Sequence, residues 1–146
     1  MKPTRQLASR SRFRSAGIWL IGLAIWCAGP MPFAAEPAAT PQQKFPDVVA
    51  VKVRPSGPGR FDFDVTVASP YDTPQRYADA FRVSGRDGSV YGERKLLHDH
   101  ADEQPFTRDL YGVAVPAGVR VIVVQARDRV FGYGGRTVEV ALPGRN

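Results

Sequence analysis

Both histidines of the chain lie in one short polar segment, together with three of its 14 acidic residues. The segment reads His98-Asp99-His100-Ala101-Asp102-Glu103. In an extended chain His98 and His100 point to the same side, about 6.6–7 Å apart along the strand, so their imidazoles can reach one ion. Imidazole with carboxylate is a ligand set that Zn(II) or Cu(II) favours. The segment therefore predicts a metal site at His98, His100, Asp102 and Glu103, with Zn or Cu(II) as the candidate cofactor.

The spacing also supports a simpler interpretation. Asp102 continues the face of His98, but four residues of extended chain span about 13 Å, which is too far for a shared ligand sphere. A third ligand would need the chain to curl back after His100, or would have to come from a neighbouring loop. The alternative is a solvated polar loop in which the histidines bind no metal.

Arg108 raises a related question about the same segment. If Phe106 and Leu110 face the core, Arg108 lies on their side, and a buried guanidinium needs a carboxylate partner. Glu103 or Asp79 would supply that carboxylate, and the polar segment would then be a structural clasp rather than a ligand site. An arginine at the strand edge, with its head group in water, is the other interpretation.

A second candidate site consists of aromatic residues in or beside loops. Tyr71, Tyr77, Phe131 and Tyr133 lie near the ends of expected strands. Loops of β-sandwiches commonly bind partners, and aromatic side chains offer a large contact area at low entropic cost. We therefore take Tyr71, Phe131 and Tyr133, with Arg108, as candidate ligand or interaction residues. The alternative is that Phe131 and Tyr133 cover the end of the core.

Residues 1–35 have the pattern of a secretory signal peptide. Five basic residues and no acid are followed by an apolar run from Ala16 to Ala28 and then by small residues and prolines up to Ala35. That run is shorter than the ~20 residues of a membrane-spanning helix. We expect export, cleavage after Ala35, no membrane span after cleavage, and a periplasmic or secreted protein. The segment contains no Arg-Arg pair, so we do not expect export by the twin-arginine route.

Removal of the leader changes the chemistry that the chain can support. The net charge falls from +6 to +1, so the high pI does not indicate nucleic-acid binding. The only cysteine, Cys27, lies in the leader after Trp26, where a lipoprotein anchor would need a small residue. No cysteine or methionine follows the expected cut, which excludes disulfides and thiolate or thioether metal sites from the mature domain.

The mature chain is organised as a tether and one domain. Residues 36–46 are rich in Ala, Pro and Gln and predict a disordered tether. Residues 47–143 alternate apolar and polar residues with turn signals between the segments. We expect strands at 49–54, 61–68, 77–84, 89–97, 105–115, 119–126 and 136–142. Asp87-Gly88 predicts a hairpin, and Gly112 predicts a break in the strand at 105–115. The Val/Ile-rich strand at 119–126 is expected to lie at the centre of its sheet and to be covered on both faces.

Seven short strands without a helix predict an all-β fold, a two-sheet antiparallel immunoglobulin-like sandwich. The closing hairpin resembles that of immunoglobulin or fibronectin type III domains, although there is no cysteine pair or tryptophan in the domain. Leu97-His98-Asp99-His100 with Glu103-Gln104-Pro105-Phe106-Thr107-Arg108 resembles a group of small secreted bacterial proteins without an assigned activity. This resemblance covers most of the mature chain and implies no particular function.

The motifs of common enzymes are missing from the sequence. There is no Gly-x-Ser-x-Gly and no His-Glu-x-x-His, and the glycines at 132–135 precede a strand instead of a helix. We therefore expect no enzyme, but an exported binding module for a divalent metal or small ligand at the His98–Glu103 loop. The alternative is a protein-interaction or envelope-assembly domain that uses the aromatic loops. The expected partner is an unknown protein or small ligand in the cell envelope.

Overall fold

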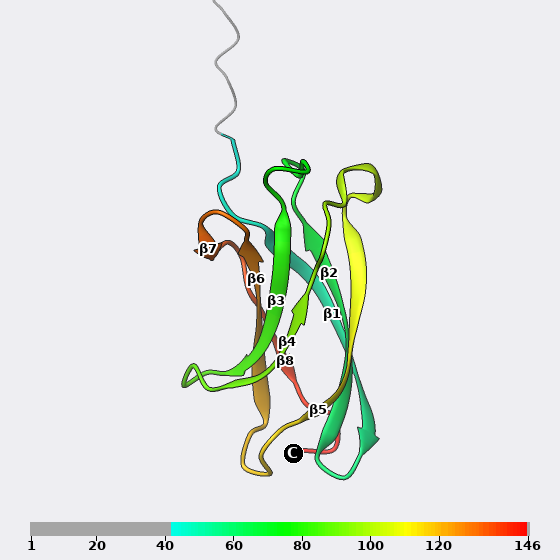
Figure 1. Ribbon diagram of the computed structural model, residues 1–146. Coiled ribbons are helices and arrows are strands. Elements are labelled where there is room, and N and C mark those ends of the chain that lie inside the picture. Colours follow the sequence, from blue (N-terminus) through cyan, green and yellow to red (C-terminus); the bar gives the residue numbers. More distant parts are fainter. Residues whose placement is uncertain (1–41, 146) are drawn as a thin grey trace, which may run out of the picture. The chain divides into compact units, whose positions relative to one another are not determined.

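The computed structural model describes residues 42–145 of the chain. Eight strands and one short 3-10 turn make up this part (Figure 1). In chain order they are β1 (Asp47–Gly57), β2 (Arg60–Ala68), β3 (Ala78–Gly85), β4 (Val90–Lys95), η1 (Ala101–Glu103), β5 (Phe106–Ala114), β6 (Val121–Asp128), β7 (Gly132–Tyr133) and β8 (Val138–Ala141).

The strands form two antiparallel sheets, which confirms the predicted all-β sandwich. One sheet has the order β1-β2-β5, and the other has the order β4-β3-β6-β7 with β8 also paired to β6. Strands β1, β2 and β5 thus lie together, and strands β3, β4, β6, β7 and β8 face them (Figure 1). The closing strand is divided, because β7 pairs with the end of β6 and β8 with its beginning.

Alternation along the strands fills the space between the two sheets. In β2 every second residue from Phe61 to Val67 is buried, as the period-two pattern predicts. These side chains belong to one core cluster with Phe81 of β3 and Ile122 of β6. Strand β6 is central in its sheet. Its residues alternate between buried and partly exposed, which shows that only one of its faces is fully covered. The prediction of burial on both faces is therefore wrong.

The predicted hairpin between β3 and β4 is present. Gly88 adopts a positive φ of 86° and donates its N–H to the Gly85 carbonyl. Asp87 accepts hydrogen bonds from the backbone N–H and the hydroxyl of Ser89, and these bonds lower the pKa of its carboxyl group. The turn returns β4 along the edge of its sheet, and β4 leads directly into the histidine segment.

The ordered packing begins before the expected domain boundary at residue 47. Pro46 is buried, and Arg76 donates hydrogen bonds to the carbonyls of Gln43 and Lys44. Residues 43–46 therefore lie on the sandwich and do not belong to a disordered tether. The predicted signal peptide, its cleavage site and residues 36–41 lie outside the described residues. Within residues 42–145, no helix has the length and apolar character of a membrane span.

Candidate functional site

The histidine segment is an irregular connection and not the extended strand that the metal prediction assumed. Strand β4 ends at Lys95, and the chain bends through His98 before entering η1. The rings of His98 and His100 lie 4.7 Å apart between centroids and are tilted by 34°. His98 is exposed, and its Nδ1 is 2.7 Å from the Asp99 carbonyl oxygen. Because a carbonyl only accepts, Nδ1 carries the proton there and Nε2 is the free nitrogen.

His100 is held from two sides and is only 3% exposed. Its backbone N–H donates to Asp72 Oδ2 over 3.1 Å, and its ring stacks on Phe106 with 3.9 Å between centroids. Its Nδ1 atom is buried and has no hydrogen-bond partner among the described residues. Burial lowers the pKa of His100, and the nearby charges of Arg108 and His98 lower it further. The imidazole is therefore held in its neutral form near pH 7.

Gln104 joins the end of the histidine segment to the end of β2. Its side-chain oxygen accepts the Ser69 N–H over 2.7 Å, while its amide nitrogen donates to the Ser69 hydroxyl and to the His100 carbonyl. Sequence reasoning missed both Gln104 and Asp72, because their partners are 35 and 28 residues away. Only the pairing of the strands brings these loops together.

The ion pair suggested for Arg108 is present, and Glu103 is its carboxylate. The Arg108 guanidinium donates to Glu103 Oε1, and this hydrogen bond lowers the pKa of the Glu103 carboxyl group. Asp79, the other candidate, is paired with Arg127 over 2.8 Å instead. The Arg108 side chain is 26% exposed, so the pair lies at the surface of the segment and not in the core.

The four predicted metal ligands do not surround one point. Glu103 is already paired with Arg108, and Asp102 is exposed on η1. Among the residues that the structure describes, no group of three His, Cys, Asp or Glu side chains is placed to hold an ion. The extended-chain geometry behind the metal prediction is therefore wrong. The chain does curl back after His100, but the curl places Glu103 against Arg108 and not beside the two histidines.

A pocket opens where β4, the histidine segment and β5 meet. Its volume is about 400 Å³, within the range of small-molecule sites. The lining consists of three cationic residues, two leucines and both histidines: Arg94, Lys95, Leu96, Leu97, His98, His100 and Arg108. Leu97 is 84% exposed, whereas Leu96 is buried. The nearest acid to Arg94 is Asp109, at 3.7 Å.

A second hollow, of about 460 Å³, lies between the β3–β4 turn and the β5–β6 loop. It is lined by turn residues and by Tyr91, Arg86 and Arg120. Arg86 is held by Glu139, which raises the pKa of that guanidinium. None of the buried polar atoms without a partner lies in this lining. We therefore regard the histidine pocket as the better candidate site.

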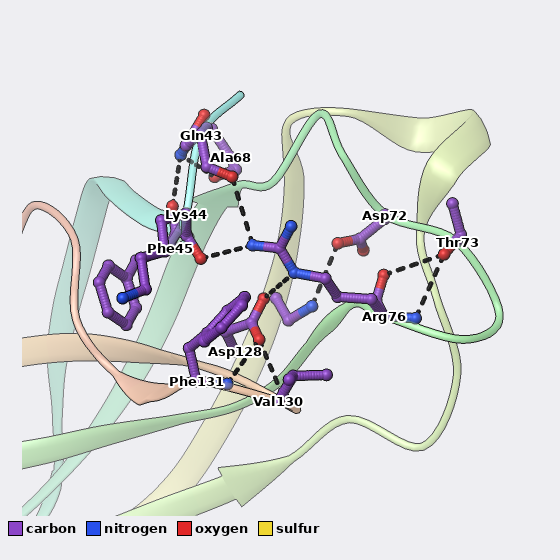
Figure 2. Close-up of polar contacts among 11 residues, drawn as sticks. Gln43, Lys44, Phe45, Ala68, Asp72, Thr73, Arg76, Asp128, Val130 and Phe131 are labelled. Atoms are coloured by element: carbon purple, nitrogen blue, oxygen red, sulfur yellow. Dashed lines mark hydrogen bonds and ion pairs between the residues drawn. The ribbon is translucent and has the colours of Figure 1, made fainter. Parts of the chain in front are cut away.

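Two of the predicted aromatic residues, Tyr71 and Phe131, lie against Arg76 at one end of the sandwich. The guanidinium lies 4.1 Å from the Tyr71 ring centroid and 4.8 Å from that of Phe131. Arg76 Nε donates to Asp128 Oδ2 over 3.0 Å, and Asp128 is fully buried. Asp128 also accepts the backbone N–H groups of Val130 and Phe131. Figure 2 shows how this cluster joins the β6–β7 loop to residues 43–45.

The electrostatics of this cluster are those of a structural lock. Burial opposes ionisation of Asp128, but the N–H donors of Phe131 and Val130 and the charge of Arg76 lower its pKa overall. Burial raises the pKa of Tyr71, and the neighbouring Asp128 carboxylate adds to that rise. The phenol therefore stays protonated and covers the ion pair.

Tyr133 lies elsewhere, on the outward face of the five-stranded sheet. Its ring covers the Arg82 guanidinium at 4.0 Å, and its hydroxyl donates to Glu93 on the edge strand β4. Burial raises the pKa of Tyr133, and the hydrogen bond to Glu93 raises it further. The three aromatic candidates are therefore not one surface. Of these, Phe131 keeps the largest exposure, 48%, beside Val130 at 61%.

Comparison with known proteins gives one informative similarity. No family model and no solved structure matches the chain. A protein of Halomicrobium mukohataei named "Putative lipoprotein" is 36% identical over 94 residues, which is 64% of this chain. The aligned part is 46% of that protein, so the chain spans about half the length of this relative. The relative's name specifies neither an activity nor a ligand.

Proposed function

We propose that this chain is an exported, non-catalytic binding module that takes a small ligand in the pocket around His98 and His100. The observation that carries the proposal is the construction of this pocket. His100 is buried, stacked on Phe106 and anchored to Asp72, yet its Nδ1 has no hydrogen-bond partner among the described residues. A buried polar atom without a partner is costly in a folded protein, and in a native structure such an atom calls for a functional explanation.

Binding is favoured over catalysis by the chemistry of the lining. The pocket presents cations, imidazoles and leucine side chains, but neither a hydroxyl nor a carboxylate. Nucleophilic catalysis by a hydroxyl or thiol needs Ser, Thr or Cys, and hydrolysis by paired carboxylates needs two acids. The lining contains none of these residue types, whereas it does offer charged and apolar contacts for a small molecule.

Two observations support an extracytoplasmic location. The order of positive charge, short apolar run and small residues in 1–35 is typical of an export signal. The relative from Halomicrobium mukohataei is named as a lipoprotein, a class of protein attached to the cell envelope. We propose that this chain works in the same compartment.

A fragment screen by NMR tests the proposal directly. The ¹⁵N-labelled processed protein is mixed with a small library of aromatic and aliphatic fragments of mixed charge. We expect amide shifts to concentrate at Leu96–His100 and Arg108, and to weaken in His100→Phe, which keeps a ring on Phe106 but removes the nitrogens. Shifts that are absent, or that occur only elsewhere on the molecule, would contradict a ligand site in this pocket.

The second candidate function is protein interaction through the exposed end of the β6–β7 loop. Val130 and Phe131 are 61% and 48% exposed beside Phe45 and Lys44, whose ammonium lies 4.9 Å from the Phe131 ring centroid. Such apolar residues at a loop favour a partner protein of the envelope. Crosslinking in envelope extracts, compared between the wild type and Phe131→Ser, would test it: loss of a specific adduct supports the interaction.

A further inference from the structure

We infer that the histidine pocket selects organic anions, namely small molecules with a carboxylate or phosphate group attached to an apolar body. The inference rests on the proposed function, because it names the ligand class of the same pocket. Three observations carry it: the charge of the lining, the availability of two of its cations, and the position of the leucines beside them.

The lining carries three permanent positive charges and no negative one. Arg94, Lys95 and Arg108 all face the pocket, from the end of β4 and from β5. Of the neighbouring acids, Glu103 is paired with Arg108 and Asp109 lies 3.7 Å from Arg94. A divalent cation would be repelled by such a surface, whereas an oxyanion would be attracted.

Two of these cations keep hydrogen-bond donors available for a ligand. Lys95 forms no ion pair within the described part of the chain. Arg94 forms an ion pair with Asp109, but the distance of 3.7 Å is beyond that of a hydrogen bond. Arg108 is engaged by Glu103, which fixes its head group at the pocket wall. A planar guanidinium can bind a carboxylate or phosphate with two parallel hydrogen bonds. Arg94 is therefore the residue best suited to receive the anion.

The leucines add a requirement for an apolar group on the ligand. Leu96 is buried under the pocket, while Leu97 is 84% exposed at its rim, next to the two available cations. An inorganic anion would use only the charges and leave this apolar surface in water. A ligand with a ring or short alkyl chain covers Leu97 and gains the free energy of removing this side chain from water.

Four probes separate these requirements: benzoate, phenyl phosphate, benzamide and inorganic phosphate. Each is titrated into the processed protein at pH 7 and low salt, and binding is followed by NMR at the amides of Leu96–His100. We expect benzoate or phenyl phosphate to bind, and the stronger of the two identifies the preferred anionic group. Neutral benzamide should bind about tenfold more weakly, as for the loss of one charged hydrogen bond. Inorganic phosphate should also bind more weakly.

Matched charge variants localise the effect. Arg94→Gln should weaken benzoate or phenyl phosphate binding about tenfold. Lys95→Gln should weaken it roughly threefold, because Lys95 is exposed and the solvent screens its charge. Lys52→Gln removes a charge that is also exposed, from β1 in the opposite sheet, and should leave binding unchanged. Since Lys95 and Lys52 are both exposed, these two variants are expected to fold normally.

The outcomes distinguish the inference from the proposed function. If benzamide binds the pocket as tightly as the two organic anions, the small-ligand function stands and selection for anions is wrong. Equal weakening by Lys52→Gln and Lys95→Gln would reduce the effect to overall charge and also overturn the inference. If none of the probes and no library fragment shifts the pocket amides, both the inference and the proposed function fail.

Discussion

The residue that best reports on the site is His100. Its ring is sandwiched between Phe106 and His98, and its backbone is fixed by the buried Asp72. Burial is the main cause of its lowered pKa, with the charges of Arg108 and His98 acting in the same direction and those of Glu103 and Asp72 opposing. The folded protein therefore holds His100 neutral at a pH where the unfolded chain would already protonate it.

This difference predicts a loss of stability on mild acidification. The lowered folded pKa means that the unfolded state binds more protons below the ordinary histidine value of 6.5. The contribution of His100 is therefore complete above pH 6.5 and is lost as the pH falls towards the folded pKa. Urea unfolding of the wild type and His100→Phe at pH 7.5, 6.5 and 5.5 measures it. We expect the wild type to lose more stability, and parallel pH profiles would contradict this account.

Asp128 has the largest expected effect on stability. It is fully buried, pairs with Arg76 and accepts two backbone N–H groups of the β6–β7 loop. Asp128→Ala leaves the Arg76 guanidinium without its carboxylate in a half-buried site, which should cost about 3 kcal/mol of unfolding free energy. The exposed pair Arg54–Asp64 is the matched control, and Asp64→Ala should change stability far less. Comparable losses in urea unfolding would show that Asp128 is not a structural lock.

Among the elements, β5 shows how a single residue alters the register between two strands. The sequence predicts a break at Gly112, and the structure has a register shift there opposite Phe61 and Phe63 of β2. Gly112 adopts a φ of 63°, and its N–H donates to Asp62 Oδ1 over 2.7 Å. This bulge lets Phe106 and Val113, which are seven positions apart, both point into the core.

Replacement of Gly112 should therefore destabilise the sandwich. A side chain at positive φ is strained, so Gly112→Ala should cost about 1–2 kcal/mol. Gly118→Ala is the matched control, because a Cβ there would meet no atom within 4 Å and its φ is not in the left-handed range. Thermal or urea unfolding of both variants checks the prediction. Equal stability of the two would mean that the bulge tolerates a side chain at no cost.

At the scale of the whole molecule, the predicted processing can be read from the N-terminus and the thiol content of the exported protein. Cleavage after Ala35 leaves a chain that begins at Glu36 and contains no cysteine. We expect N-terminal sequencing of extracytoplasmic material to begin there, and Ellman's reagent to detect no thiol in the denatured protein. A mature form that starts at Cys27 and carries lipid would instead place this chain with its lipoprotein relative.

Much of the architecture followed from local patterns. Alternation with period two identified the main strands, and Asp87-Gly88 identified the turn between β3 and β4, because side-chain direction and turn geometry depend on neighbouring residues. The ion pair between Glu103 and Arg108 could also be predicted from the sequence, since the two residues are only five positions apart. The segment that forms the pocket was recognised by its concentration of polar residues.

The chemistry of that segment depended on tertiary structure. The sequence alone placed His98, His100, Asp102 and Glu103 in an extended chain and suggested a metal. In the structure, Asp72 and Ser69 from the end of β2 and the loop after it bind the segment in a bent form. β4 and β5 then add Arg94, Lys95 and Arg108 to the pocket. These contacts join residues far apart in the chain, and only the pairing of strands into two sheets brings them together.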